Sequence, residues 1–406
     1  MKRQIIILTA ALVAVAWGVS AQIRNPGSSC TPAELYYCQL WPDTCTCSSP
    51  VVSRVAPVPR LQIPRRIGVV ALAKDGGYNG LWRSESGYPN WVAAQEVSGY
   101  GISAVHLWPM VSLTDEPGWW ITDDYRDMAY VFENPGLDLI VIRPMQHSFS
   151  ELACDGLRAA VWEGGDWGQY AEDLLRKFGN VKKTVVLLNW EGDWQLWGAR
   201  CREPNECPTG DVWPSRQHEE YAACGSDYDC QKAVCDEVRD GRAWYLRKLF
   251  EERQAGIQAA REAHPAAALT VLFGITVNHT EDDEFGRINL TRDVIPFLEH
   301  QPDVICLSHW DRDQTIVEAL DYIQDHTGHA RYNTIVVEVG ARVGDTQGPE
   351  LFQKIDAAMA WGAQAVFVWA WHHPWPTGAD WSIIAADNTT NGGMEAIQQL
   401  MQKYER

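Results

Sequence analysis

The 406-residue sequence predicts an α/β protein of the (β/α)8 TIM-barrel class. Eight short apolar runs rich in β-branched residues recur along the chain, and such continuous runs are typical of parallel strands buried on both faces. Segments in which apolar residues recur with helical spacing lie between these runs. This alternation favours a closed barrel, with an open doubly wound sheet as the alternative.

The predicted strands span residues 67–73, 102–108, 137–143, 184–190, 269–276, 303–310, 334–340 and 365–371. Helices are predicted at residues 168–179, 243–264 and 349–362. The longest interruption, residues 197–240, follows the fourth strand and contains five cysteines. In a barrel this segment is a strand-to-helix loop on the catalytic face, so we predict a disulfide-rich insertion there.

Residues 1–21 have the pattern of a secretory signal peptide. Lys2 and Arg3 precede an apolar run, and small residues end the segment at Ala21. The run is short for a membrane span, so an uncleaved anchor is the less favoured alternative. We therefore expect a secreted protein, extracellular or periplasmic, with no membrane association after cleavage. Residues 22–66, rich in Cys, Pro and Ser, are interpreted as an N-terminal extension or linker, and residues 67–406 as the barrel domain.

The chain has 11 cysteines, none of them in the predicted signal segment. Cys306 lies in an apolar run and is expected to be a buried free thiol. The other ten would form disulfides in an oxidising compartment. Zinc binding by the five cysteines between residues 197 and 240 is the alternative, less favoured because their spacing is irregular. The ten cysteines are Cys30, Cys38, Cys45, Cys47, Cys154, Cys201, Cys207, Cys224, Cys230 and Cys235.

The amino-acid composition disfavours some classes of binding partner and favours another. The net charge of −19 argues against nucleic acid and anionic membrane surfaces. Twenty tryptophans favour carbohydrate binding, because indole rings stack on the apolar faces of sugars. The sequence has no H-E-x-x-H pattern, no helix-opening G-x-G-x-x-G and no G-x-S-x-G elbow, so we expect no metal and no cofactor. We expect a monomer whose partner is a carbohydrate.

Polar residues at the carboxyl ends of the strands are the candidates for chemistry, since barrel enzymes place reactive groups there. Glu191 follows the fourth strand, and Glu338 lies within the seventh, where a buried carboxylate is costly unless it is paired or functional. Strands four and seven face each other across an eight-stranded barrel. Two opposed carboxyl groups suit glycosidic bond cleavage, in which one protonates the leaving oxygen and the other attacks the anomeric carbon or activates water. An ion pair with an arginine such as Arg143 is the structural alternative for Glu338.

These strand ends resemble the retaining (β/α)8 glycosidases of clan A, which include cellulases, mannanases and xylanases. The matching motifs are Asn189-Trp190-Glu191, SHWD (308–311), VVEVG (336–340) and VWAW (368–371). The resemblance implies that Glu191 is the acid/base and Glu338 the nucleophile of a double displacement. Strand four departs from the clan, because Trp190 separates Asn189 from Glu191 and Gly192 replaces the usual proline.

The resemblance also implies a substrate-binding set. Asn189 would bond near the 2-hydroxyl of the sugar, and His309 and Trp310 would flank the nucleophile. Trp369 and Trp371 alternate along strand eight and are expected to share one face, with one lining the cleft and the other in the core. A satisfied core histidine is the alternative for His309. The complete predicted set is Asn189, His309, Trp310, Trp369, Trp371, Trp108, Arg143 and Asn278.

Two similar phrases, WEGGDW (162–167) and NWEGDW (189–194), have different interpretations. The first leads into a predicted helix, and its Asp166 is placed like a helix cap. The second ends a buried strand and carries Glu191. Asp193 in the second phrase is interpreted as a supporting carboxylate or helix cap rather than a catalytic group.

The favoured function is a secreted retaining glycoside hydrolase that acts on a β-linked polysaccharide or oligosaccharide. One alternative is a non-catalytic carbohydrate-binding barrel, which would keep a tryptophan-lined cleft without turnover. The other is an exported hydrolase of a different class that uses its histidines.

Overall fold

A computed structural model describes twelve ranges of the chain, all within the compact unit Pro57–Arg406. The predicted signal segment and nearly all of residues 22–66 lie outside these ranges, so both stay predictions. The described ranges are 63–71, 90–107, 126–143, 165–189, 192–197, 223–224, 227–282, 289–309, 314–329, 331–372, 381–384 and 389–405.

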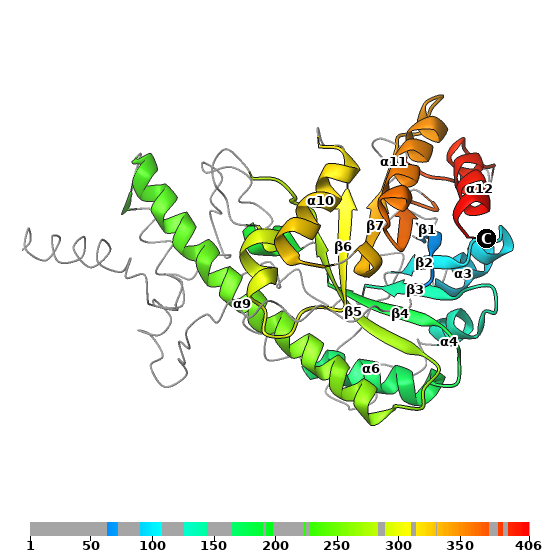
Figure 1. The fold of residues 1–406 in the computed structure, drawn as a ribbon, viewed down its shortest axis with the longest axis horizontal. Coiled ribbons are helices and arrows are strands. Elements are labelled where there is room, and N and C mark those ends of the chain that lie inside the picture. Colours follow the sequence, from blue (N-terminus) through cyan, green and yellow to red (C-terminus); the bar gives the residue numbers. More distant parts are fainter. Residues whose placement is uncertain are drawn as a thin grey trace, which may run out of the picture. The chain divides into compact units, whose positions relative to one another are not determined.

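Eight parallel strands close into a barrel in sequence order, with β1 hydrogen-bonded to both β2 and β8 (Figure 1). All eight predicted strands are confirmed, and the closed order excludes the open doubly wound sheet. The strands are β1 (Arg66–Val70), β2 (Ala104–Leu107), β3 (Leu139–Ile142), β4 (Thr184–Asn189), β5 (Thr270–Val277), β6 (Val304–His309), β7 (Thr334–Val339) and β8 (Ala365–Val368).

Helices surround the barrel and connect its strands (Figure 1). The three predicted helices correspond to α6, α9 and α11, although α9 begins 15 residues earlier than predicted. The helices are α3 (Asn90–Gly99), α4 (Arg126–Glu133), α6 (Gly165–Phe178), α7 (Gly192–Trp197), α9 (Tyr228–Ala263), α10 (Ile316–Thr327), α11 (Gln347–Trp361) and α12 (Gly393–Tyr404). The short helical turns of the described ranges are η5 (Leu290–Val294), η6 (Ile295–Phe297) and η7 (Arg331–Asn333).

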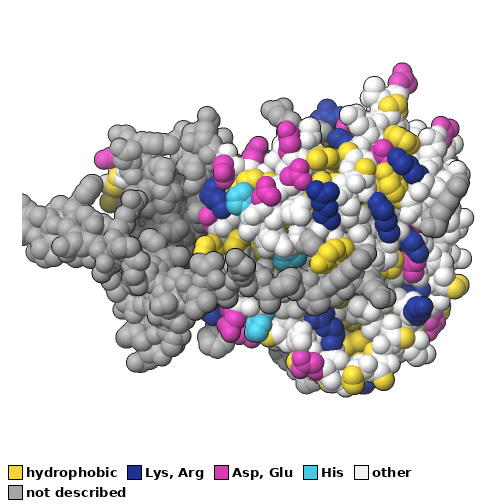
Figure 2. Space-filling model, viewed as in Figure 1, with side chains coloured by type: hydrophobic (Ala, Val, Ile, Leu, Met, Phe, Trp, Pro, Cys, Tyr) yellow, Lys and Arg dark blue, Asp and Glu magenta, His cyan; other side chains and the backbone are white. Residues whose placement is uncertain are grey.

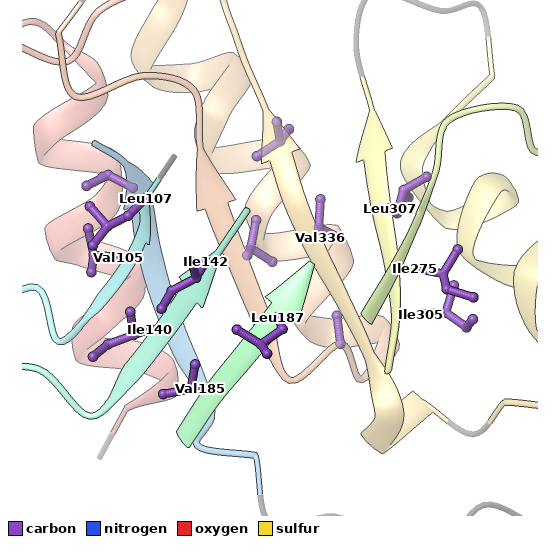
Figure 3. Packing of buried hydrophobic residues seen from close by; sticks show 14 of the residues in the cluster. Val105, Leu107, Ile140, Ile142, Val185, Leu187, Ile275, Ile305, Leu307 and Val336 are labelled. Atoms are coloured by element: carbon purple, nitrogen blue, oxygen red, sulfur yellow. The ribbon is translucent and has the colours of Figure 1, made fainter. Parts of the chain in front are cut away.

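The core consists of two layers, because side chains alternate between the two faces of each strand. One layer fills the barrel interior and includes Val186, Leu188 and Cys306. The other lies between the strands and the helices and includes Val185 and Leu187, which Figure 3 shows with their counterparts from neighbouring strands. Odd-numbered residues of β4 therefore face the helices, and even-numbered residues face the interior.

Helix α9 corrects the predicted insertion. Residues 228–240 were expected to belong to a loop, whereas they form the first turns of a helix that continues to Ala263. Figure 1 shows this long helix alongside α6. Asp227 caps it, since its side chain accepts a hydrogen bond from the Cys230 amide at 3.1 Å.

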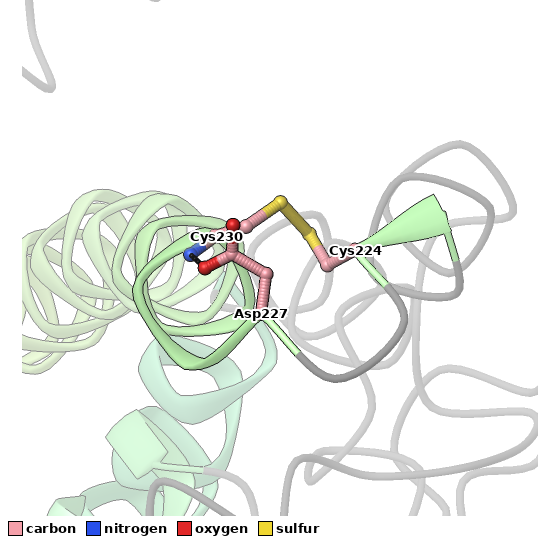
Figure 4. Close-up of a disulfide and its surroundings, with 3 residues drawn as sticks. All are labelled: Cys224, Asp227 and Cys230. Carbon is pink, nitrogen blue, oxygen red and sulfur yellow. Dashed lines mark hydrogen bonds between the residues drawn. A yellow bond between two sulfur atoms is a disulfide. The ribbon is translucent and has the colours of Figure 1, made fainter.

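A disulfide joins Cys224 to Cys230 beside this helix start (Figure 4). It links two of the five cysteines predicted to staple the insertion. Cys306 is free and fully buried in the barrel interior, as predicted, and its burial raises the pKa of the thiol. The remaining predicted disulfides involve side chains outside the described residues.

The described surface is of mixed charge. On the face drawn in Figure 2, basic side chains lie among acidic and hydrophobic ones. The net charge of −19 is thus not expressed there as an uninterrupted acidic surface. Over the described ranges, no helix combines the length and the hydropathy that a membrane span requires.

Gly274 of β5 tests the packing of the barrel interior. A Cβ atom at this position would lie 2.9 Å from Cys306 Sγ and 2.9 Å from Val186 Cγ1. We expect Gly274→Ala to lower the free energy of unfolding by about 1–3 kcal/mol, because the interior has no room for a methyl group. Gly99→Ala is the control, since a Cβ there meets nothing within 4 Å. Urea unfolding of the two variants measures the difference, and equal stabilities would contradict this view of the interior.

Candidate active site

The carboxyl ends of the strands meet at one rim of the barrel, where a layer of inward-facing side chains lies above the apolar interior. His106 of β2, Ser308 of β6 and Glu338 of β7 belong to this rim layer, and all three are buried. Trp369 follows β8 and packs with the interior residues. Polar groups from three strands therefore converge at the rim where a barrel enzyme carries its chemistry.

A β-bulge turns Glu338 into the barrel. Leu307 of β6 pairs with Val336, whereas the next residue, Ser308, pairs with Glu338, so β7 contains one extra residue at this point. The pairing with β8 shows the same shift. Val336 packs toward the helices and Val337 toward the interior, and without the bulge Glu338 would face the helices.

The hydrogen bond made by Glu338 agrees with an inward orientation. The Ser308 hydroxyl donates to Glu338 Oε2 at 3.1 Å, and only 5% of Glu338 is exposed. Ser308 follows Val304 and Cys306 on the interior face of β6. A buried carboxylate that accepts this hydrogen bond in the barrel interior is held in a defined position.

His106 lies beneath this bulge and is neutral. Its Nδ1 is 3.4 Å from the carbonyl oxygen of Val337, so Nδ1 carries the proton and donates it. Its ring also packs edge-on against Phe367, with the ring centroids 6.2 Å apart. Burial, together with the positive charge of Arg143, lowers the pKa of His106 to about 3.

Arg143 is the residue that follows β3. It is buried, and its backbone amide donates to the Leu107 carbonyl oxygen at 2.9 Å, which fixes it at the rim. Its charge acts on His106, so the two residues are electrostatic neighbours. His106 was not in the predicted substrate-binding set. The signal that identifies it is a histidine inside an apolar strand, on the same face as Ala104.

Asn189 faces away from the barrel interior. It ends β4 on the face shared with Val185 and Leu187, and its Oδ1 accepts a hydrogen bond from Arg253 Nη1 of α9. The guanidinium of Arg253 also lies 4.1 Å from the centre of the Trp167 ring. This placement does not support the predicted contact between Asn189 and the sugar, so Asn189 is better described as part of the helix-facing layer.

Asp193 supports the rim, as the sequence suggested. It is fully buried in α7, and its Oδ2 accepts hydrogen bonds from the amides of Asn278 at 2.9 Å and His279 at 3.0 Å. Its Oδ1 accepts a third from the Leu290 amide at 2.8 Å. One carboxylate thus connects the segment after β4 with the segment after β5 and with η5. Gly192 before it packs against Leu290, whose side chain would have to move if residue 192 carried a Cβ atom.

Asn278 and His309 have structural contacts. Asn278 is buried just beyond β5 and bonds to Asp193 through its backbone. His309 Nε2 donates to the backbone carbonyl of Gln314 at 3.0 Å, and Gln314 is itself bonded to Thr280. This contact ties the loop after β6 to the loop after β5, which agrees with the alternative interpretation of His309.

The two tryptophans after β8 occupy different layers, so the expectation of a shared face is wrong. Trp369 packs with the interior residues, whereas Trp371 packs in the helix-facing layer against Tyr100, with the ring centroids 5.3 Å apart. Trp371 Nε1 donates to Glu96 of α3 at 3.2 Å. Strand β8 ends at Val368, so the strand alternation does not extend to Trp371. Trp371 belongs to the core, and Trp369 is the one of the pair that lies near the rim layer.

Glu191, Trp108 and Trp310 lie outside the described residues, so the pairing of the two carboxyl groups stays a prediction. Within the described ranges, no group of three or more His, Cys, Asp or Glu side chains is arranged to hold a metal ion.

Neither a protein-family model nor a curated protein sequence matches the chain. Among solved structures, the chain is similar to exo-beta-1,4-mannosidase Op5Man5 from Opitutaceae bacterium strain TAV5, with a TM-score of 0.50 and 12% identity over 84% of this chain and 59% of that chain. The shared property is the (β/α)8 fold.

Two further solved structures resemble the chain more weakly. One is a GH5-4 broad specificity endoglucanase from Clostridium acetobutylicum, with a TM-score of 0.48, 11% identity, and coverage of 83% of this chain and 96% of that chain. The other is beta-glucosidase from Thermotoga maritima in complex with noeuromycin, with a TM-score of 0.49, 12% identity, and coverage of 84% and 98%.

Asp193 is expected to be a major determinant of stability. Asp193→Ala leaves three backbone N–H groups without their acceptor, and each buried group of this kind costs about 1–3 kcal/mol. Asp193→Asn keeps one oxygen acceptor and should cost less. Thermal unfolding measures both, with Asp345→Ala in the exposed turn after β7 as the control. A midpoint of Asp193→Ala equal to that of the control would contradict the supporting role.

Neutral His106 makes stability depend on pH. Its pKa is about 3 in the folded state, whereas an unfolded histidine has a pKa of about 6.5, so only the unfolded state gains a proton as the pH falls between these values. Its contribution to stability is fully present above about pH 6.5 and is lost as the pH falls toward 3, and the loss reaches roughly 2–3 kcal/mol at about pH 4.5. We expect His106→Gln to lose less unfolding free energy than the wild type between pH 7 and pH 4.5. Parallel pH dependences in urea unfolding would show that this assignment is wrong.

Proposed function

We propose that this protein is a retaining glycoside hydrolase that cleaves β-linked bonds in an oligosaccharide or polysaccharide, with Glu338 as the nucleophile and Glu191 as the acid/base. The observation that carries the proposal is the inward orientation of Glu338, which a bulge in β7 directs into the rim of the barrel. A bulge that re-aims a single buried carboxylate is a local irregularity of the kind found beside active sites.

The proposed reaction has two displacements. In the first, a carboxylate oxygen of Glu338 forms a bond to the anomeric carbon, the bond to the leaving oxygen breaks, and Glu191 donates its proton to that oxygen. In the second, Glu191 removes a proton from water, whose oxygen attacks the anomeric carbon and releases Glu338. Strand β4, which precedes Glu191, is separated from β7 by β5 and β6 in the closed order of eight strands, so residues beyond the two strand ends can approach a bond from different sides of the barrel rim.

The surroundings of Glu338 suit a nucleophile. Ser308 donates one hydrogen bond to its Oε2, and the neighbouring His106 is neutral, so His106 neither protonates Glu338 nor pairs with it as a cation. Trp369 packs at the adjacent strand end and would offer an aromatic surface to a sugar ring. The described residues of the rim layer thus combine one carboxylate with neutral polar and aromatic partners, and Arg143 supplies the positive charge nearby.

Export and assembly belong to the same proposal. The signal-like residues 1–21 and the high number of cysteines support secretion, and the disulfide between Cys224 and Cys230 is compatible with an oxidising compartment. Under this proposal the protein is exported as a monomer and hydrolyses a carbohydrate polymer outside the cell. The named functions of the similar structures, which include an exo-beta-1,4-mannosidase, agree with this substrate class.

Glu338→Gln is the decisive test of the nucleophile. The variant keeps an oxygen that accepts from Ser308, so the fold should persist, whereas turnover of a β-linked substrate should fall by at least about 10³-fold because the amide does not attack the anomeric carbon. Substrates come from a polysaccharide panel, and proton NMR of the first product identifies its anomer. The control is Glu350→Gln, which changes a partly exposed carboxylate of α11 that pairs with Lys354.

The alternatives predict other outcomes of this test. A carbohydrate-binding barrel would bind a saccharide in calorimetry and release no reducing ends, and a hydrolase that uses its histidines would keep its activity in Glu338→Gln. An inverted first product would remove Glu338 as a nucleophile while leaving a hydrolase. Full activity of the variant with an unchanged fold would end the proposal.

A further inference from the structure

Arg253 is a buried cation in an otherwise apolar layer. It lies in α9, in the core between the helices and the strands, and only 1% of it is exposed. A guanidinium in such a place is costly unless its N–H groups and its charge find partners. Leu249, Phe250 and Ile257, each about one helical turn from Arg253 on α9, are fully buried. Packing alone therefore does not account for an arginine at this position.

The contacts of Arg253 lead to the end of β4. Its Nη1 donates to Oδ1 of Asn189, the last residue of that strand. Its guanidinium lies over the Trp167 ring at 4.1 Å, a distance at which a cation is attracted to the face of the indole. Trp167 comes from α6, so α6, β4 and the later helix α9 meet at this cation.

The backbone at the end of β4 is held from the other side as well. The Thr276 hydroxyl of β5 donates to the carbonyl oxygen of Asn189 at 2.8 Å. Beyond the strand, Asp193 is fixed by three backbone amides. Glu191 follows Asn189 by two residues and precedes Asp193 by two. The described residues two positions before and after Glu191 in the sequence are thus both anchored, and Arg253 supplies the side-chain part of the first anchor.

We infer that Arg253 is a positioning residue, which holds the side chain of Asn189 and thereby sets the position of Glu191 as acid/base. This inference rests on the proposed function. Trp167 completes the arrangement by covering the cation, so the first of the two similar sequence phrases supports the second. Arg253 itself faces the helix layer and does not touch the substrate.

Displacement of the general acid Glu191 should slow the hydrolysis of some substrates more than that of others, depending on the leaving group. Protonation of the leaving oxygen accelerates departure of a sugar alcohol, whereas a 2,4-dinitrophenolate leaves without a proton because it is a weak base. The value of kcat/KM reports the first displacement, in which the leaving group departs. A residue that positions the acid therefore affects kcat/KM for a β-linked oligosaccharide much more than for the 2,4-dinitrophenyl glycoside of the same sugar. A change that only loosens the fold lowers both values together.

The experiment compares Arg253→Met with Arg261→Met on the full chain. Arg261 lies two turns further along the same helix and bonds to Asp303 and to the Val271 carbonyl, near the opposite ends of the strands, so it controls for loss of a helix-to-barrel contact. We expect Arg253→Met to lower kcat/KM for the oligosaccharide by about 10²-fold, the scale of general acid catalysis, and for the dinitrophenyl glycoside by less than about threefold. Arg261→Met should change the ratio of the two values little. Arg253→Lys, which keeps the charge, should restore part of the loss.

Two further variants separate the outcomes. Asn189→Ala removes the acceptor and leaves the cation in place, so it should reproduce the unequal loss even if Arg253→Met does not fold. Equal losses on both substrates, or no loss, in Arg253→Met or in Asn189→Ala would overturn the positioning role while Glu338→Gln remains inactive and the proposed function stands. A wild-type chain that hydrolyses neither substrate, or a fully active Glu338→Gln, would instead refute the proposed function.

Discussion

The alternation of side chains between the interior and the helix-facing side of the barrel is the constraint on which the site depends. Each strand offers its residues to these two faces in turn, and only a bulge reverses the order. The extra residue of β7 does this, so Glu338 joins the interior face together with Ser308. A regular β7 would place the same carboxylate among apolar side chains under α11, where it would be costly and could not meet a substrate.

The two strand ends that carry the proposed carboxyl groups are stabilised in different ways. At β7, Glu338 accepts a hydrogen bond from the Ser308 hydroxyl, and neutral His106 donates to the carbonyl of Val337. At β4 the partners lie in the helix layer or in the loops, and they include the cation of Arg253 and the anion of Asp193. The helix-facing layer thus carries the cation that binds the Asn189 side chain, whereas the interior rim carries Glu338, with the charge of Arg143 nearby.

Features of the fold and of the site were predictable from the sequence when they depend on residues close together in the chain, and not when they depend on distant ones. The eight strands were predictable because their apolar runs are local and continuous, and Cys306 was predictable as a buried thiol for the same reason. The sequence did not reveal which face of the barrel Asn189 and Trp371 occupy. Asn189 depends on a partner 64 residues away, and Trp371 lies beyond the end of β8, where alternation no longer applies. A bulge leaves no mark in the pattern VVEVG, since valine suits either face.

The two similar phrases now have distinct physical explanations. In WEGGDW, helix α6 begins at Gly165, so Asp166 lies in its first turn rather than at the cap, and Trp167 extends its ring over Arg253. In NWEGDW, Asn189 receives that arginine and Asp193 collects three backbone amides. The phrases share residue types because both run into a helix start, where Gly and Asp are favoured. The guanidinium of Arg253 connects the two segments, because it contacts Trp167 in the first and Asn189 in the second. A change at Trp167 would therefore reach the end of β4 without touching it, since it would remove the surface that makes a buried cation tolerable beside Asn189.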